Sequence, residues 1–130
     1  MDLRALTLAT TLMFNLNTSV VESANTEEIQ QSVYELQYEE EQMNKLIDFL
    51  YKQVGKPYVW GASGTQAYDC SSLVQEAYRM IDVELARVSY LQAREGVDVP
   101  LENIRAGDIV TFVTSNRNNG DVTHVGIYVR

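Results

Sequence analysis

The sequence is poor in the residues that form disulfides and bind metals. It has one cysteine, Cys70, and one histidine, His124, in 130 residues. A single cysteine cannot form an internal disulfide, so cysteine pairing says nothing of the redox compartment. One Cys and one His also make a poor metal site, because zinc sites take three or four protein ligands. We therefore expect neither a metal nor an organic cofactor.

Basic residues are also scarce. Ten Lys and Arg stand against eighteen Asp and Glu, which gives a net charge of −8. The excess is local, since residues 22–41 hold seven acids and no base, whereas residues 42–130 hold ten acids and nine bases. No basic stripe is available to neutralise phosphates, so the sequence argues against nucleic acid as a partner. With 45% hydrophobic and 22% charged residues, the composition is that of a globular domain.

The apolar run near the start of the chain is too short to span a membrane. Residues 5–16 form a mostly apolar segment of twelve residues, whereas a spanning helix needs about twenty. The length suits the core of an export signal, but Asp2 offsets Arg4 and Glu22 stands where a small residue would precede cleavage. Residues 1–24 therefore keep three interpretations: a signal segment, a helix packed on the domain, and a disordered leader.

Residues 25–54 are predicted to form a helix. Asn25 can cap its start, with Glu28 completing a capping box, and Gly55 followed by Pro57 marks its end. Apolar residues recur every seven positions, at Ile29, Leu36, Met43 and Leu50.

This heptad pattern allows two interpretations. One is a coiled-coil arm through which two chains pair. The other, which we favour, is a helix that packs on its own domain and is broken near residues 39–41. We accordingly expect a monomer, with a dimer through residues 25–50 as the alternative.

The cysteine lies at the start of a second predicted helix. Leu73, Val74 and Ala77 follow at helical spacing, and Asp69 is a good N-cap, which puts Cys70 in the first helical turn. The unpaired N–H groups and the dipole at a helix start favour an anion, and hence the thiolate. A thiolate is a strong nucleophile, but it needs a partner that moves protons.

The histidine lies on a predicted strand, residues 122–129, which follows a polar turn and pairs with a strand over residues 108–113. Alternation puts Val125 and Ile127 on the core face and His124 on the opposite face, where the start of the cysteine helix could approach. A unique Cys opening a helix and a unique His on a strand are typical of a Cys–His nucleophilic pair. The alternative is a small buried cysteine and a core histidine.

Five segments around these two residues resemble, in order, the motifs of the NlpC family of papain-like cysteine peptidases, which cut the peptide stems of bacterial cell walls. The segments are Gly55–Gly61, Asp69–Val74, Leu85–Gln92, Ala106–Phe112 and His124–Tyr128. The resemblance covers residues 43–130, preceded by an acidic helical extension at residues 25–42. It implies an α+β fold, with N-terminal helices packed on a small antiparallel sheet.

The resemblance also implies roles for individual residues. Cys70 would be the nucleophile and His124 its proton-transfer partner. The hydroxyl of Tyr58 would bind substrate or stabilise the oxyanion. Asp69, besides capping the helix, would hold the free amine of the stem peptide.

Three further residues, Ser71, Arg87 and Ser89, match positions near the family's substrate pocket. For Arg87 and Ser89 the alternative is an exposed arginine and a capping serine. Ser72 stands where the family usually has Gly, a departure from which we expect little effect.

The family's third catalytic residue is a His, Asn or Gln on the strand after the histidine strand. The sequence has no counterpart before Arg130, so we expect a domain with truncated C-terminal strands and an exposed strand edge. Three explanations stay open: a fragment, another group that orients the ring, or an impaired protein.

The resemblance finally implies a reaction and a cellular location. The substrate would be the peptidoglycan stem peptide, cut between the γ-carboxyl of D-glutamate and the next diamino acid through a thioester. The protein would then work in the cell envelope or outside the cell. The alternatives are an amidase or acyltransferase on the same scaffold, and a wall-binding protein without activity.

Overall fold

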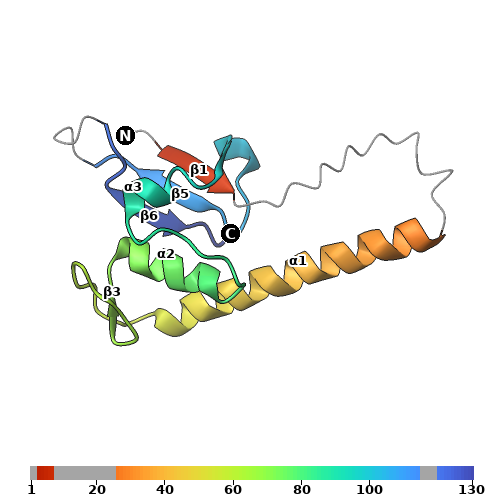
Figure 1. Ribbon diagram of the computed structural model, residues 1–130, viewed down its shortest axis with the longest axis horizontal. Helices are drawn as coiled ribbons and strands as arrows, with labels where there is room; N and C mark the ends of the chain where they lie inside the picture. Colours follow the sequence, from red (N-terminus) through yellow and green to blue (C-terminus); the bar gives the residue numbers. More distant parts are fainter. Residues whose placement is uncertain (1–2, 8–25, 115–119) are drawn as a thin grey trace.

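A single long helix, α1 (Thr26–Gln53), runs past the rest of the chain in the computed structural model (Figure 1). The structure describes residues 3–7, 26–114 and 120–130, and for residues 3–7 it describes the backbone alone. The predicted helix is thus confirmed from Thr26, whereas Asn25 lies outside the described residues. The helix is continuous through residues 39–41, so the predicted break is wrong. Gly55 ends it in the left-handed region, at φ 93°.

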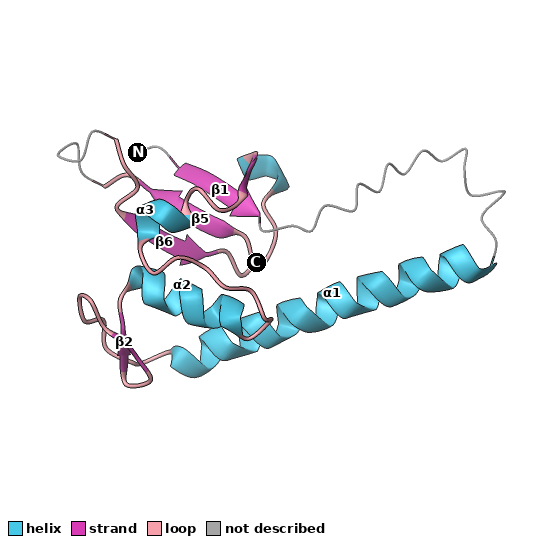
Figure 2. Ribbon diagram, viewed as in Figure 1, coloured by secondary structure: helices cyan, strands magenta, loops and turns pink. Residues whose placement is uncertain are grey.

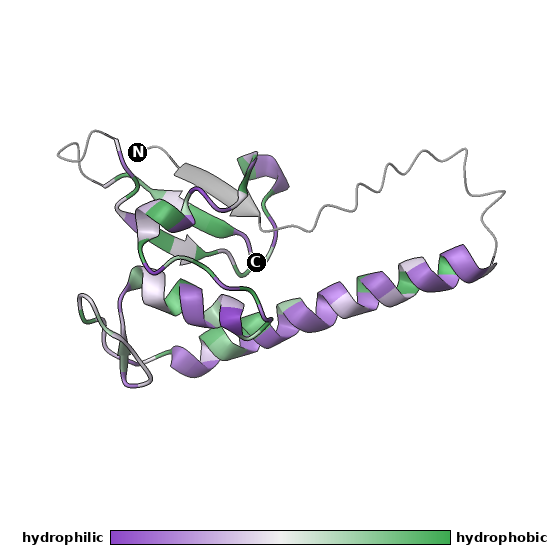
Figure 3. Cartoon of the chain, viewed as in Figure 1, coloured by the Kyte–Doolittle hydropathy of each residue, from purple (hydrophilic) through white to green (hydrophobic). Residues whose placement is uncertain are grey.

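The two halves of α1 have different surroundings. Leu46 is fully buried, and Ile47, Phe49 and Leu50 pack against the core. Ile29, Val33 and Leu36, in contrast, are about half exposed or more, on a part of the helix that projects from the domain and is mostly hydrophilic (Figure 3). Packing on the domain is therefore confirmed for the second half and wrong for the first. None of the described helices has the length and hydropathy required to cross a bilayer.

The strands form a small antiparallel sheet, as predicted (Figure 2). Its four strands lie in the order β4 (Val97–Val99), β1 (Leu3–Thr7), β5 (Ile109–Phe112) and β6 (His124–Ile127). Strand β6 pairs with β5 on one side only, so it is an edge strand among the described residues. A separate hairpin consists of β2 (Ser63–Gly64) and β3 (Ala67–Tyr68).

Strand β1 was not predicted. Residues 3–7 belong to the segment 1–24, for which a packed helix is one of the three interpretations. In the structure, residues 5–7 pair with β4 and residues 3–6 pair with β5. The helix interpretation is thus wrong for these residues, and residues 8–25 lie outside the described part. The physical reason is tertiary: strands β4 and β5 each present unpaired backbone groups, and an extended segment between them satisfies both.

Helix α2 (Cys70–Arg79) joins the sheet to α1. Val74, Ala77 and Tyr78 of α2 enter the core, where they meet Leu46 of α1 and Val125 of β6. The hydroxyl of Tyr78 donates a 2.6 Å hydrogen bond to the carbonyl of Gly107, just before β5. Short helices α3 (Ser89–Gln92) and η1 (Leu101–Asn103) lie in the connections. Helices packed on a small sheet confirm the α+β class, and α2 lies between α1 and β6 in the core.

The place of β1 predicts that residues 1–7 stabilise the domain. Deleting them would leave the facing edges of β4 and β5 unpaired, and we expect the melting temperature to fall by about 5–10 °C. Deletion of residues 1–2 alone, which lie before β1, is the matched control and should have little effect. Equal melting temperatures for both deletions would show that β1 adds nothing to the sheet.

Candidate active site

Cys70 is the first residue of α2, and the start of this helix is closely capped. The backbone N–H of Ser72 donates to Asp69 Oδ1 at 2.8 Å, and the N–H of Asp69 donates to Ser72 Oγ at 2.9 Å. The prediction that Asp69 caps the helix is confirmed. Little effect was expected from a serine in place of the family's usual glycine at position 72. Ser72 nevertheless supplies the second half of this capping box, and it is fully buried.

The carboxylate of Asp69 is held by Arg87 through two parallel hydrogen bonds. Arg87 Nη1 lies 3.0 Å from Oδ1, and Nη2 lies 2.8 Å from Oδ2. Oδ2 also accepts the N–H of Gly61 at 3.2 Å, and Oδ1 accepts the hydroxyl of Ser71 at 3.3 Å. Desolvation works to raise the pKa of Asp69, but the hydrogen bonds from Arg87 and Ser72 outweigh it and lower the pKa to about 2. Asp69 is therefore ionised near neutral pH.

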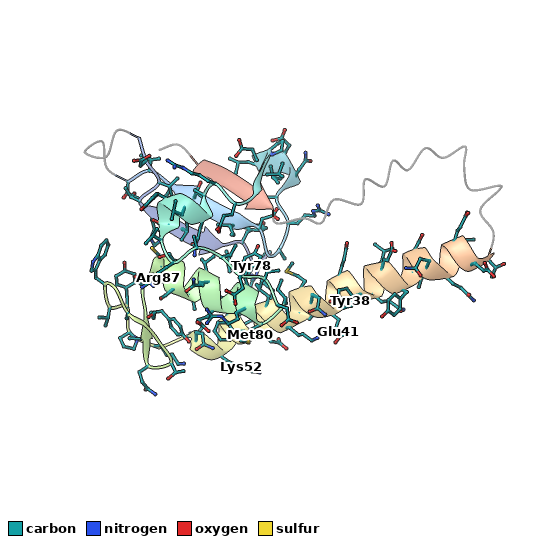
Figure 4. The ribbon with its side chains drawn as sticks, viewed as in Figure 1. Tyr38, Glu41, Lys52, Tyr78, Met80 and Arg87 are labelled. Carbon is teal, nitrogen blue, oxygen red and sulfur yellow. The ribbon has the colours of Figure 1, made fainter. Side chains whose placement is uncertain are left out.

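Arg87 links separate segments at the start of α2. Its Nη2 donates to the carbonyl of Ala62 at 3.0 Å, and its Nη1 donates to Ser71 Oγ at 3.1 Å. Its side chain is 34% exposed and lies beside the first turn of α2 (Figure 4), so the alternative of an exposed arginine is wrong. Ser89 does not cap α3, since the N-cap is Val88 and makes no side-chain capping bond.

Gln92 ends the segment Leu85–Gln92, and the sequence does not indicate a role for it. Its side chain is fully buried, and its Nε2 donates to the carbonyls of Ser71 and Ala86 at 2.9 and 2.8 Å. It thus ties the segment before α3 to the first turn of α2. Sequence reasoning missed this role because glutamine is usually an exposed residue, and only the tertiary fold places it here.

A pocket of about 440 Å³ opens beside Cys70. Cys70, His124, Tyr58 and Asp69 all line it, so the structure brings together four of the seven candidate residues. Its remaining lining comes from the end of α1, the following turn, the hairpin, α2 and β6: Leu50, Gln53, Lys56, Pro57, Tyr68, Leu73, Val74, Val125, Gly126, Ile127 and Val129. Ser71 and Arg87 belong to the hydrogen-bond network of Asp69, and Ser89 does not line the pocket. Among the described residues, no three His, Cys, Asp or Glu side chains converge as a metal site would require.

Tyr58 lines the same pocket as Cys70. The charge of Cys70 is one of the influences on the Tyr58 hydroxyl. Although the residue is 60% exposed, partial desolvation, followed by the charges of Cys70 and Asp69, raises the pKa of Tyr58. The hydroxyl therefore stays protonated and can donate a hydrogen bond. Its loop is held in place by the N–H of Val59, which donates to the carbonyl of Tyr68 at 3.0 Å.

His124 is the first residue of the edge strand β6. It is exposed while Val125 is buried, so the predicted alternation is confirmed. The body of α2 packs on the core face of β6, where Val74, Ala77 and Tyr78 share a cluster with Val125. Cys70 and His124 nevertheless line the same pocket, which lies at the edge of the sheet.

Comparison with known proteins shows which proteins this chain resembles. Residues 55–130 match the NlpC/P60 family. The murein DD-endopeptidase MepH of Escherichia coli is 36% identical over 91 residues, which are 67% of this chain and 31% of the relative. A gamma-D-glutamyl-L-lysine dipeptidyl-peptidase of Bacillus subtilis is 33% identical over 76 residues, 58% of this chain and 25% of the relative.

The fold has solved counterparts as well. The crystal structure of an NLP/P60 family protein of Staphylococcus aureus, described as similar to lipoprotein, gives a TM-score of 0.64 at 33% identity. The match covers 69% of this chain and 31% of that one. The chain thus spans about a third or less of the length of these proteins.

The pair formed by Asp69 and Arg87 predicts how stability depends on pH. Folding lowers the pKa of Asp69 to about 2, whereas in the unfolded chain this pKa is about 4. The ionised carboxylate therefore contributes its full stabilisation above about pH 4, and this contribution is lost as the pH falls through about 2. It amounts to roughly 2 kcal/mol. Urea unfolding of the wild type and Asp69→Asn should therefore differ at pH 6 and converge towards pH 2.

Two conservative substitutions distinguish the contribution of the Asp69–Arg87 interaction to stability from that of an exposed ion pair. Arg87→Lys keeps the charge but cannot bind both carboxylate oxygens, so it should lower the free energy of unfolding by about 1–2 kcal/mol. Arg94→Lys is the matched control, since the ion pair of Arg94 with Asp121 is exposed and 3.7 Å long. If the two variants unfold alike, the network around Asp69 has no special weight.

Proposed function

Because this chain belongs to the NlpC/P60 family, we propose that it is a cysteine peptidase that hydrolyses amide bonds in the peptide stems of bacterial peptidoglycan. The observation that carries the proposal is that the only cysteine and the only histidine of the chain line one pocket. The peptidase names of the relatives support the reaction class. This substrate lies in the cell envelope, which is where we place the protein.

In the first step, the thiolate of Cys70 attacks the carbonyl carbon of the scissile amide. His124 takes the thiol proton as general base. The negative charge that develops on the carbonyl oxygen needs hydrogen-bond donors. The N–H of Cys70 belongs to the first helical turn, where backbone N–H groups lack intrahelical partners, and the hydroxyl of Tyr58 is a second donor from the lining of the same pocket.

The second half of the reaction releases the products. His124 protonates the leaving amine as the tetrahedral intermediate collapses to a thioester on Cys70. Water, deprotonated by His124, then attacks the thioester carbon, which frees the acid product and restores the thiol. No step in this sequence needs a metal or an organic cofactor.

We assign Asp69 and Arg87 to positioning the nucleophile. Both carboxylate oxygens of Asp69 already accept hydrogen bonds, from Arg87, Gly61, Ser71 and Ser72, and the residue is 8% exposed. A substrate ammonium would have to compete with Arg87 for this carboxylate. Capping therefore fits the geometry better than the amine-binding role that the family resemblance implied. Ser71 shares this network, and a substrate contact of Ser89 has no support from the pocket.

Two bonds in the stem are candidates. We place the cleavage between the γ-carboxyl of D-glutamate and the following diamino acid, which agrees with the name of the Bacillus subtilis relative. The match to an enzyme named a DD-endopeptidase makes a DD bond the second candidate. The two bonds give different products, so digestion of a stem tetrapeptide and of a cross-linked dimer distinguishes them.

The test is digestion of a stem tetrapeptide with product identification by mass spectrometry. The wild type should release L-alanyl-D-glutamate, and Cys70→Ala should lower turnover at least about a thousandfold, since it removes the nucleophile. The melting temperature of Cys70→Ala should stay within a few degrees, because only one sulfur atom is lost.

Other outcomes contradict the proposal in different ways. Cleavage of a cross-linked dimer into two intact tetrapeptides would indicate a DD bond, and separation of muramic acid from L-alanine in a wall fragment would indicate an amidase. Turnover retained in Cys70→Ala would exclude the thiol mechanism. Binding of wall fragments without hydrolysis would indicate a wall-binding protein.

A further inference from the structure

The imidazole of His124 has an aromatic neighbour on the adjacent strand. Phe112 and His124 are directly opposite each other in the β5–β6 ladder. Their ring centroids lie 5.7 Å apart, and the ring planes are tilted by 46°. Both values fall in the range in which two rings attract each other, and directly opposed side chains are the closest pairs in an antiparallel ladder.

Phe112 is itself well placed to hold another ring. It belongs to β5, which is paired on both sides, with Leu3 of β1 as its other neighbour. Its carbonyl accepts two hydrogen bonds from Thr123, one from the N–H at 2.9 Å and one from the hydroxyl at 3.3 Å. Thr123 immediately precedes His124, and its hydroxyl oxygen also accepts a 2.8 Å hydrogen bond from the N–H of Thr114. The backbone that leads into His124 is therefore tied to Phe112.

The side chain of His124 lacks such ties of its own. It is exposed and opens an edge strand, and its ring forms no hydrogen bond with the other residues of the described ranges, 3–7, 26–114 and 120–130. An exposed imidazole would change rotamer freely, and only some rotamers direct a ring nitrogen towards Cys70. The contact with Phe112 restricts that choice.

We propose that Phe112 is a positioning residue for His124, one that holds the imidazole over the pocket of Cys70 through ring packing. The proposal rests on the proposed function in one respect, the catalytic role of His124. An apolar ring fixes the orientation of the imidazole but cannot select which nitrogen carries the proton. Phe112 therefore supplies the directional part of what a polar third residue does in related catalytic sites.

The decisive variant is Phe112→Leu in the full chain, with Phe112→Tyr as the conservative variant that keeps the ring. Phe49→Leu is the matched control, because Phe49 packs against the core from α1 and does not line the pocket. An aromatic contact of this kind corresponds to a change in rate of about three- to tenfold. We expect Phe112→Leu to lower kcat by that factor with KM unchanged, Phe112→Tyr to restore most of it, and Phe49→Leu to change the melting temperature alone.

A second measurement reads the contact without turnover. The chain has one histidine, so its imidazole proton signals identify themselves in an NMR spectrum. The ring of Phe112 should displace these signals in the wild type and in Phe112→Tyr, and Phe112→Leu should return them towards those of a free histidine. Unchanged imidazole signals in Phe112→Leu, or an equal loss of kcat in Phe112→Leu and Phe49→Leu, would overturn the proposal.

The two measurements separate this inference from the proposed function. A wild type that hydrolyses no stem peptide would end the proposed function, while the imidazole signals would still decide whether Phe112 positions His124.

Discussion

The paired hydrogen bonds between Asp69 and Arg87 are the interaction on which the arrangement of the site depends. Asp69 caps the helix that carries Cys70 and also receives the N–H of Gly61, while Arg87 binds the carbonyl of Ala62. The two residues thereby join the loop of Tyr58, the first turn of α2 and the segment before α3. Nearly every donor and acceptor in this network has a hydrogen-bond partner. Its desolvated charges therefore stabilise the fold, whereas an unpaired buried charge would destabilise it.

This pair also shapes the electrostatics at the nucleophile. A capping carboxylate directly before Cys70 would on its own place negative charge beside a thiolate. Arg87 neutralises that charge, so the helix start keeps the positive end of its dipole towards the pocket. The same pair explains why Asp69 stays ionised far below neutral pH, and why its carboxylate is poorly available to a substrate amine. The cap of α2 and the proposed role of Cys70 therefore depend on the same contacts.

Much of this site could be predicted from local patterns. The cap at Asp69, the helix start at Cys70 and the alternation of His124 with Val125 follow from sequence periodicity, which depends on neighbouring residues. Two features could not be predicted, because each depends on contacts between residues that are far apart in the sequence. Strand β1 forms because two distant strands leave edges for it. Arg87 meets Asp69 across 18 residues. The unbroken course of α1 has a local cause, because Glu is a good helix former and Glu39–Glu41 continue the helix although they interrupt its apolar stripe.

The account claims that Cys70 and His124 act as one catalytic pair, and the reactivity of Cys70 tests that claim most directly. Cys70 is the only thiol in the chain, so its alkylation by iodoacetamide can be followed by mass without interference. Near pH 7 the account predicts alkylation faster than that of free cysteine, slowed several-fold in His124→Ala and reduced to the free rate in the urea-unfolded chain. A folded chain whose Cys70 reacts no faster than free cysteine, with or without His124, would contradict the account.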